Sequence, residues 1–207
     1  MATSSHGRPR RVLVVCGHPD SRSFSRALAD AYVSGLPDGV EVETLPLGDL
    51  TFDPVLRHGY REFMPADPVI ERSQQLVKWA DHLVFVFPCW FGNVPSLLKG
   101  WFERVMTPGF AFNYSNTSLI DLGLRVQRHL AGRTATIIST YSGPPWYFRA
   151  MFTDPVRLVK KENLGFVGIK TTGVLRLGWI DSPRRDSLAR REAFLAKVQA
   201  SASRLPR

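Results

Sequence analysis

Short, almost uninterrupted apolar runs alternate with helical segments along this chain, and that alternation constrains the fold most. Three such runs are RVLVVC at 11–16, HLVFVF at 82–87 and TATIIST at 134–140. Runs of this kind are typical of parallel strands that helices cover on both faces. Two further strands are predicted at 40–47 and 166–175. The pattern therefore predicts an α/β fold with a five-stranded parallel sheet and helices on both faces.

Helical segments follow each of these strands. Apolar spacing and Pro or Ser at the starts predict helices to about 34, at 68–79, from 95 to about 108, at 146–161, and from Ser182–Pro183 onward. Residues 113–132 are predicted to be irregular. Because parallel strands all end at one edge of the sheet, the loops at 17–25, 88–95 and 140–148 are expected to meet there, where such sheets bind ligands.

The first of these loops, GHPDSRSFS, has the residues of a phosphate site. Hydroxyls of Ser23 and Ser25 and the imidazole of His18 stand where a helix begins, and free N–H groups at a helix N-terminus attract phosphate. The alternative is that Ser21 or Ser23 simply caps the helix. The loop matches neither the P-loop nor the GxGxxG dinucleotide pattern.

The second loop, PCWFGNVP, offers Trp90 and Phe91 as a stacking surface for a flat ring, and we interpret that ring as a flavin. The third loop, STYSGPPWYF, adds hydroxyls and backbone donors, with aromatic residues beyond them as a wall or lid. In both loops the alternative is that the aromatic residues belong to the core. Cys89 has no visible His–Asp partners, so thiol catalysis is not favoured.

The net charge of +9 lies mostly at the two ends of the 207-residue chain. Residues 1–11 contribute +3, and residues 183–207 carry seven Arg or Lys against two acids. A nucleic-acid binder concentrates charge on a folded face, so nucleic-acid binding is not favoured. Residues 1–10 are expected to be a flexible N-terminus before a single domain at 11–207.

Two isolated cysteines, the lack of a secretory leader and the lack of a long apolar run favour a reduced, cytoplasmic setting without membrane insertion. No Cys/His spacing of a metal site is present, so no metal is expected.

Taken together, the loops resemble those of the flavodoxin-like NAD(P)H dehydrogenase (quinone) family. This family includes mammalian quinone reductase, bacterial modulator-of-drug-activity proteins and the ancillary oxidoreductases of potassium efflux systems. The resemblance rests on GHPDSRSFSRAL at 17–28, FDPVL at 52–56, FVFPCWFGNVPSLLKGWFERVMTPGFAF at 85–112 and, more loosely, STYSGP at 139–144.

The resemblance implies a three-layer, flavodoxin-like sandwich with strand order 2-1-3-4-5, bound FAD or FMN, and a homodimer. It also implies two-electron, ping-pong reduction of quinones or similar acceptors by NADH or NADPH. By position, the implied flavin contacts are His18, Ser23, Phe24, Ser25, Pro88, Cys89, Trp90, Phe91, Asn93, Thr140, Tyr141, Ser142 and Gly143. Phe112, Tyr114 and Trp146 are the expected substrate-binding residues.

The chain departs from the mammalian members in its lid. Those members carry a Tyr and a His as a proposed proton relay, whereas here Tyr147 is the candidate catalytic phenol and no histidine follows it before Lys160. Two alternatives stay open. One is a regulatory flavoprotein subunit of a potassium efflux system. The other is a flavodoxin-like electron carrier, although such carriers usually have an acidic surface and this chain is basic.

Overall fold

The computed structural model describes residues 11–62, 64–114, 126–150 and 154–205. Five strands form one parallel sheet in the order β2-β1-β3-β6-β7. Their bounds are β1 Arg11–Cys16, β2 Glu41–Pro46, β3 His82–Pro88, β6 Thr134–Thr140 and β7 Lys170–Leu177. Since β6 and β7 are the fourth and fifth strands of this sheet, the predicted order is confirmed.

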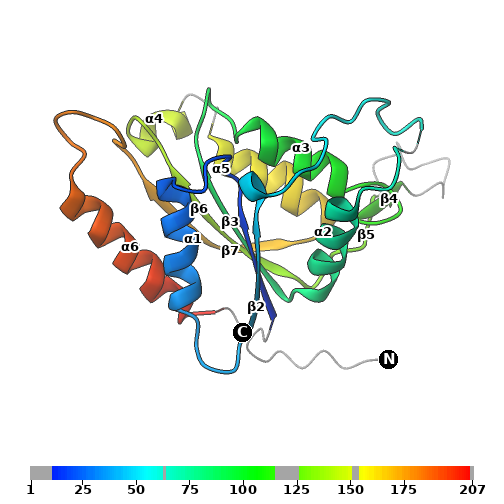
Figure 1. The fold of residues 1–207 in the computed structure, drawn as a ribbon, viewed down its shortest axis with the longest axis horizontal. Coiled ribbons are helices and arrows are strands. Elements are labelled where there is room, and N and C mark those ends of the chain that lie inside the picture. The colour runs from blue at the N-terminus through cyan, green and yellow to red at the C-terminus, as the bar shows by residue number, and fades with distance from the viewer. Residues whose placement is uncertain (1–10, 63, 115–125, 151–153, 206–207) are drawn as a thin grey trace.

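Helices cover both faces of the sheet, which makes three layers (Figure 1). One face carries α1 (Phe24–Ser34) and α6 (Leu188–Ala202). The other carries α2 (Pro68–Trp79), α3 (Ser96–Val105), α5 (Pro155–Leu158) and a π-helical segment, η2 (Val159–Gly165). Shorter elements are η1 (Leu47–Asp49), α4 (Pro145–Ala150), β4 (Phe112–Tyr114) and β5 (Val126–Arg128).

The central strands explain why the apolar runs are so nearly continuous. Every residue of β3 is buried, and the side chains of β1 alternate between two cores. Leu13 and Val15 pack with α2 and α3, whereas Val12 and Val14 pack with α1 and α6. Close contact of α1 with α6 requires Gly35, because a Cβ there would lie 2.1 Å from the Gln199 carbonyl oxygen.

The last helix begins later than the sequence predicts. Ser182–Pro183 does not open it; Asp181 adopts a positive φ of 61°, and the N-cap is Ser187, whose Oγ accepts from the Arg190 N–H. The fifth strand also starts later, at Lys170, because the π-helical segment runs to Gly165 and Gly168 then turns the chain with a φ of 97°.

The stretch predicted to be irregular, 113–132, contains regular structure. Its first two residues belong to β4, which pairs antiparallel with β5 at Val126–Arg128. The predicted helix at 146–161 is not one helix, because Asp154 has an extended conformation and caps a new helix. α4 lies at the start of this range, α5 and the π-helical segment η2 lie at its end, and residues 151–153 lie outside the described residues. The flexible N-terminus predicted at 1–10 also lies outside them.

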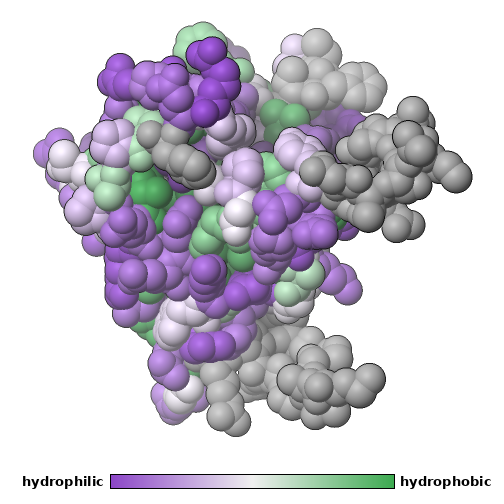
Figure 2. Space-filling view, turned by 90° about the vertical axis from the view of Figure 1, so that its right-hand side faces the viewer, coloured by the Kyte–Doolittle hydropathy of each residue, from purple (hydrophilic) through white to green (hydrophobic). Residues whose placement is uncertain are grey.

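The side of the molecule that carries α2 and β4 is mostly hydrophilic, with hydrophobic residues in small, separate groups (Figure 2). Within the ranges that the structure describes, none of the helices has the length and apolar character needed to cross a bilayer.

Candidate functional site

A cavity of about 370 Å³ opens at the edge of the sheet where β1, β3, β6 and β7 end. The first loop contributes His18, Asp20, Ser23, Phe24 and Ser25 to its wall; the second contributes Pro88, Cys89 and Trp90; the third contributes Thr140, Tyr141 and Ser142. Ile180, Asp181 and Arg191 complete the wall. The three loops therefore come together as expected, and the volume of the cavity is within the range of ligand-binding sites.

The N-terminus of α1 supplies the best anion-binding groups of this cavity. The N–H groups of Phe24 and Ser25 donate no hydrogen bond within the described part of the chain, as expected at a helix start. Ser23 is the N-cap, and its Oγ accepts from the Arg26 N–H at 3.3 Å. The capping interpretation is thus correct for Ser23, but its O–H hydrogen is still able to donate to a ligand.

His18 is fixed as a neutral donor. Its Nδ1 accepts from the Asp20 N–H at 2.9 Å, which leaves the proton of the neutral ring on Nε2. Burial lowers the pKa of His18, and its ring lies edge-on against Trp90 with centroids 5.1 Å apart. This ring therefore links the phosphate-binding part of the cavity to its aromatic part.

The second loop is a tight two-residue turn. Trp90 and Asn93 exchange both backbone hydrogen bonds, at 2.9 Å each, while Phe91 and Gly92 have φ values of 48° and 72°. Two positive φ values in succession characterise a type I′ turn, in which Asn-Gly is preferred and a bulky first residue is strained. The turn leaves Trp90 in the cavity wall and turns Phe91 fully into solvent.

Backbone hydrogen bonds hold the third loop between its neighbours. Cys89 N–H donates to the Thr140 carbonyl at 2.7 Å, and Ile180 N–H donates to the Tyr141 carbonyl at 2.9 Å. The N–H groups of Ser142 and Gly143 have no acceptor among the described residues. Because Ser142 lines the cavity, its N–H is suited to bond the polar edge of a flat ring.

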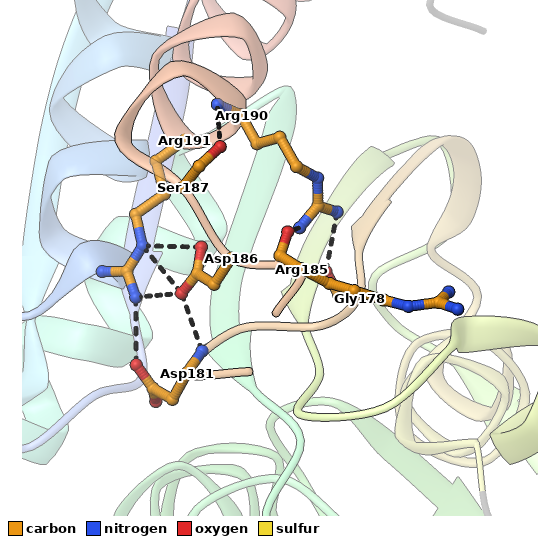
Figure 3. Close-up of polar contacts among 7 residues, drawn as sticks. All are labelled: Gly178, Asp181, Arg185, Asp186, Ser187, Arg190 and Arg191. Carbon is orange, nitrogen blue, oxygen red and sulfur yellow. Dashed lines mark hydrogen bonds and ion pairs between the residues drawn. The ribbon is translucent and has the colours of Figure 1, made fainter. Parts of the chain in front are cut away.

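The segment after β7 was not foreseen in the sequence, although it contributes to the cavity. Arg191 Nη2 lies 3.0 Å from Asp181 Oδ1 and 2.5 Å from Asp186 Oδ2, and Asp181 N–H donates to Asp186 (Figure 3). The Arg191 guanidinium also stands 5.3 Å from the centre of the Phe24 ring. One signal was present: a fifth parallel strand must end at the same edge, so the residues that follow it belong to the site.

Charge in the cavity is balanced internally rather than strongly positive. Its wall holds the carboxylates of Asp20 and Asp181 and the single guanidinium of Arg191. The Arg191 hydrogen bond lowers the pKa of Asp186 to about 2, so this partner is ionised at neutral pH. A phosphate here must therefore be held mainly by N–H and O–H groups and the helix dipole.

Burial raises the pKa of Cys89 to about 11, so its thiol is protonated and is unsuited to act as a nucleophile. Among the residues that the structure describes, no group of three or more His, Cys, Asp or Glu side chains is placed to hold a metal ion.

Seven predicted residues do not line the cavity: Phe91, Asn93, Gly143, Phe112, Tyr114, Trp146 and Tyr147. Asn93 Oδ1 instead accepts from the Val94 N–H, and Phe112 is buried in the core. Trp146 and Tyr147 lie on α4, edge to face with each other, and both are exposed, as is Tyr114.

A larger cavity of about 450 Å³ lies among α1, α6 and β7. Its hydroxyls are already used, because Thr172 donates to the Ala135 carbonyl and Ser201 to the Val198 carbonyl. Tyr32 and Thr136 interact with the buried His82. The smaller cavity, with its free backbone donors, is therefore the better candidate for a site.

Comparison with known proteins fits this arrangement. A family model described as the flavodoxin-like fold matches residues 10–201. The chain belongs to this family. NAD(P)H dehydrogenase (quinone) 1 of Cavia porcellus is 36% identical over 129 residues, which cover 51% of this chain and 46% of that relative. The resemblance to the quinone dehydrogenases is thus confirmed, and the chain spans about half the length of that relative.

Two solved structures of this flavodoxin-like type illustrate the likeness. Smu.1420 of Streptococcus mutans UA159 has a TM-score of 0.77 and 29% identity, covering 94% of this chain and 100% of that one. An FMN-dependent NADH-azoreductase of Bacillus anthracis, solved in complex with FMN, has a TM-score of 0.67 and 19% identity, covering 96% of this chain and 100% of that one. At 19% identity, the similarity to the azoreductase concerns the fold alone.

Proposed function

We propose that this protein is a flavin-dependent NAD(P)H oxidoreductase that reduces quinones or similar flat acceptors by two electrons. The observation that carries the proposal is the cavity itself. It places the free N–H groups of a helix start and the hydroxyls of Ser23 and Ser25 beside the wall formed by Trp90 and the third loop. A phosphate and a flat polar ring, joined in one molecule, match these two halves.

The residues present fit a flavin. The Phe24 and Ser25 N–H groups, the two serine hydroxyls and the Nε2–H of His18 are all donors, as a phosphate requires. The ring would lie against Pro88, Cys89 and Trp90, with backbone donors of the third loop at its polar edge. FMN and FAD share these parts, and both remain candidates. The relatives' names support a nicotinamide donor, NADH or NADPH.

In this proposal the protein binds and orients, and the cofactor supplies the hydride chemistry. Pro88, Cys89 and Trp90 of the cavity wall would hold the ring, and its remaining surface would serve the nicotinamide donor and then the acceptor. Phe112, Tyr114 and Trp146 remain the proposed acceptor-binding residues, and Tyr147 the proposed proton donor. A Tyr147→Phe variant tests the last role: it should lower kcat without changing flavin occupancy.

Ser23 and Ser25 provide the decisive test. The double variant Ser23→Ala/Ser25→Ala should weaken FMN or FAD binding to the apo-protein at least about tenfold, because hydrogen bonds to a charged phosphate are among the stronger ones. The matched control is Ser34→Ala at the other end of α1, an exposed hydroxyl that bonds only the Ala31 carbonyl. Its affinity should equal that of the wild type.

The wild-type protein should also be yellow as purified, and anaerobic NADH or NADPH should bleach it. A colourless apo-protein that takes up neither FMN nor FAD would refute the proposed function. Flavin binding that ignores the serine substitutions would refute the phosphate assignment alone.

We further propose that the chain forms a homodimer in the cytoplasm. Exposed aromatic side chains beside the cavity, on the Phe91 turn and on α4, support a covered surface there. Both cysteines are free and buried, which supports a reducing setting. Light scattering after size exclusion should give twice the chain mass, and a monomer would contradict this assembly.

A further inference from the structure

A buried carboxylate lies beneath the third loop of the cavity. Asp154 is only 2% exposed. Its Oδ1 accepts from the Tyr141 hydroxyl at 2.7 Å and from the Val156 N–H at 3.2 Å, and its Oδ2 accepts from Arg176 Nη2 at 2.8 Å. One side chain thus ties together the loop after β6, the start of α5 and the strand β7.

This arrangement is costly for folding. The Asp154 side chain is only 3% exposed, whereas that of Arg176 is 24% exposed. Such a largely buried ion pair is often no more stabilising than apolar side chains of similar volume, since the buried charge loses its water. Moreover, Arg176 Nε is buried without a hydrogen-bond partner among the described residues. A polar cluster that is only partly satisfied is a poor stabilising device. Its position, directly under the candidate site, therefore points to a role in that site.

Tyr141 connects Asp154 with the cavity. Tyr141 is one of the residues that line the cavity, and its side chain is buried. Burial and the nearby Asp154 raise the pKa of Tyr141, so the phenol remains a donor to the carboxylate. Its own N–H donates to the Leu177 carbonyl at 2.9 Å, and its ring packs against Phe148 of α4 with centroids 5.1 Å apart.

We propose that Asp154 is a positioning residue for the flavin site: by anchoring the Tyr141 side chain, it holds loop 140–143 in the shape that leaves the Ser142 N–H group free for the ligand. Asp154 does not touch the cavity itself. Arg176 and the Val156 N–H hold the carboxylate in place through hydrogen bonds to its two oxygens. This inference rests on the proposed function for its ligand, but not for the ordering of the loop.

The mildest test is Tyr141→Phe, which removes the hydroxyl and keeps the ring. The chain offers a matched control in Tyr32→Phe, because Tyr32 is equally buried and its hydroxyl also bonds a buried side chain, His82, on the other face of the sheet. Two quantities are measured for each variant: hydrogen exchange of the ligand-free protein and the Kd of the apo-protein for FMN and FAD.

Tyr141→Phe should speed exchange in peptides covering 139–150 and raise the flavin Kd about five- to tenfold, which corresponds to about 1.4 kcal/mol at the upper end. Tyr32→Phe should change neither quantity, even if it lowers the melting temperature as much. Asp154→Asn, which keeps an oxygen acceptor for Tyr141 but removes the charge, should lie between wild type and Tyr141→Phe in Kd.

Each outcome has a distinct meaning. Faster loop exchange with an unchanged Kd would overturn the positioning role, and so would unchanged exchange in a protein that binds flavin. If the wild type binds no flavin, the proposed function fails, and the exchange data alone then decide whether Asp154 orders the loop.

Discussion

His82 makes the fold sensitive to acid in a way that can be worked out from its surroundings. The side chain is completely buried at the start of β3. Its Nδ1 lies 2.7 Å from Thr134 Oγ1, and its Nε2 lies 3.1 Å from Thr136 Oγ1 and 3.4 Å from the Tyr32 hydroxyl. These partners are all neutral, because burial raises the pKa of Tyr32 to about 12. Burial accordingly lowers the pKa of His82 from 6.5 to about 4.

The direction in which pH changes the free energy of unfolding follows from comparing proton uptake by the folded and unfolded chains. Above pH 6.5 both states hold a neutral imidazole, so His82 has no effect on the free energy of unfolding. Between pH 6.5 and about pH 4 only the unfolded chain takes up the proton, so stability falls as pH falls. The pKa difference of roughly 2.5 units, at about 1.36 kcal/mol each, gives a total loss of about 3 kcal/mol.

The variant His82→Gln removes the titration and keeps an amide for the hydroxyls. Urea unfolding of both proteins at about pH 7.5, 6 and 4.5 gives the free energy of unfolding at each pH. The variant starts lower, but the gap should shrink by most of about 3 kcal/mol on going to the acidic end. Parallel pH curves for the two proteins would show that the imidazole finds water or a counter-charge, and would refute this reasoning.

Three further changes test other features. Phe91→Asn should raise the free energy of unfolding by about 1 kcal/mol in thermal or urea unfolding, since Asn tolerates the positive φ that strains Phe91; no gain would argue against strain in the turn. Arg191→Met should raise the flavin Kd several-fold, most at low salt, because Asp181 and Asp186 would then repel the phosphate unopposed. Arg72→Met is its control, as Arg72 pairs with Glu43 and does not line the cavity, and an equal effect of both variants would contradict the argument. Gly35→Ala should lower the urea midpoint by forcing α1 from α6, at a cost of about 1–3 kcal/mol, and a wild-type midpoint would show that the helices adjust freely.

Much of the site followed from the sequence because topology alone brings it together. Apolar runs fixed which segments are central strands, and parallel strands must end at one edge, so the three loops had to meet. Ten of the thirteen predicted flavin residues line the cavity for this reason. Phe91, by contrast, could not be placed by pattern: whether an aromatic residue in a loop faces inward depends on turn geometry, and here two positive φ values reverse its direction.

The segment from 178 to 191 shows a second limit of sequence reasoning. Ser182–Pro183 is a good helix start by local rules, but Asp186 accepts from the Asp181 N–H and pairs with Arg191. These contacts hold the segment as a loop until Ser187 caps α6. Which of the two possible helix N-termini forms depends on hydrogen bonds between side chains several residues apart. The spacing of apolar residues carries no information on these hydrogen bonds.

The places where this chain breaks local rules are not scattered. All three non-glycine residues with positive φ in the described ranges, Phe91, Trp179 and Asp181, lie at the carboxyl edge of the sheet, and the buried charge of Asp154 lies beneath it. The opposite edge holds His82, whose ring nitrogens all have partners. Strain and buried charge persist only where the surrounding structure holds them in place, and they gather at binding sites. The two features should therefore respond differently to substitution. Phe91→Asn, which relieves backbone strain, should change the free energy of unfolding, whereas Tyr141→Phe, which removes the hydrogen bond to Asp154, should change the affinity for the ligand.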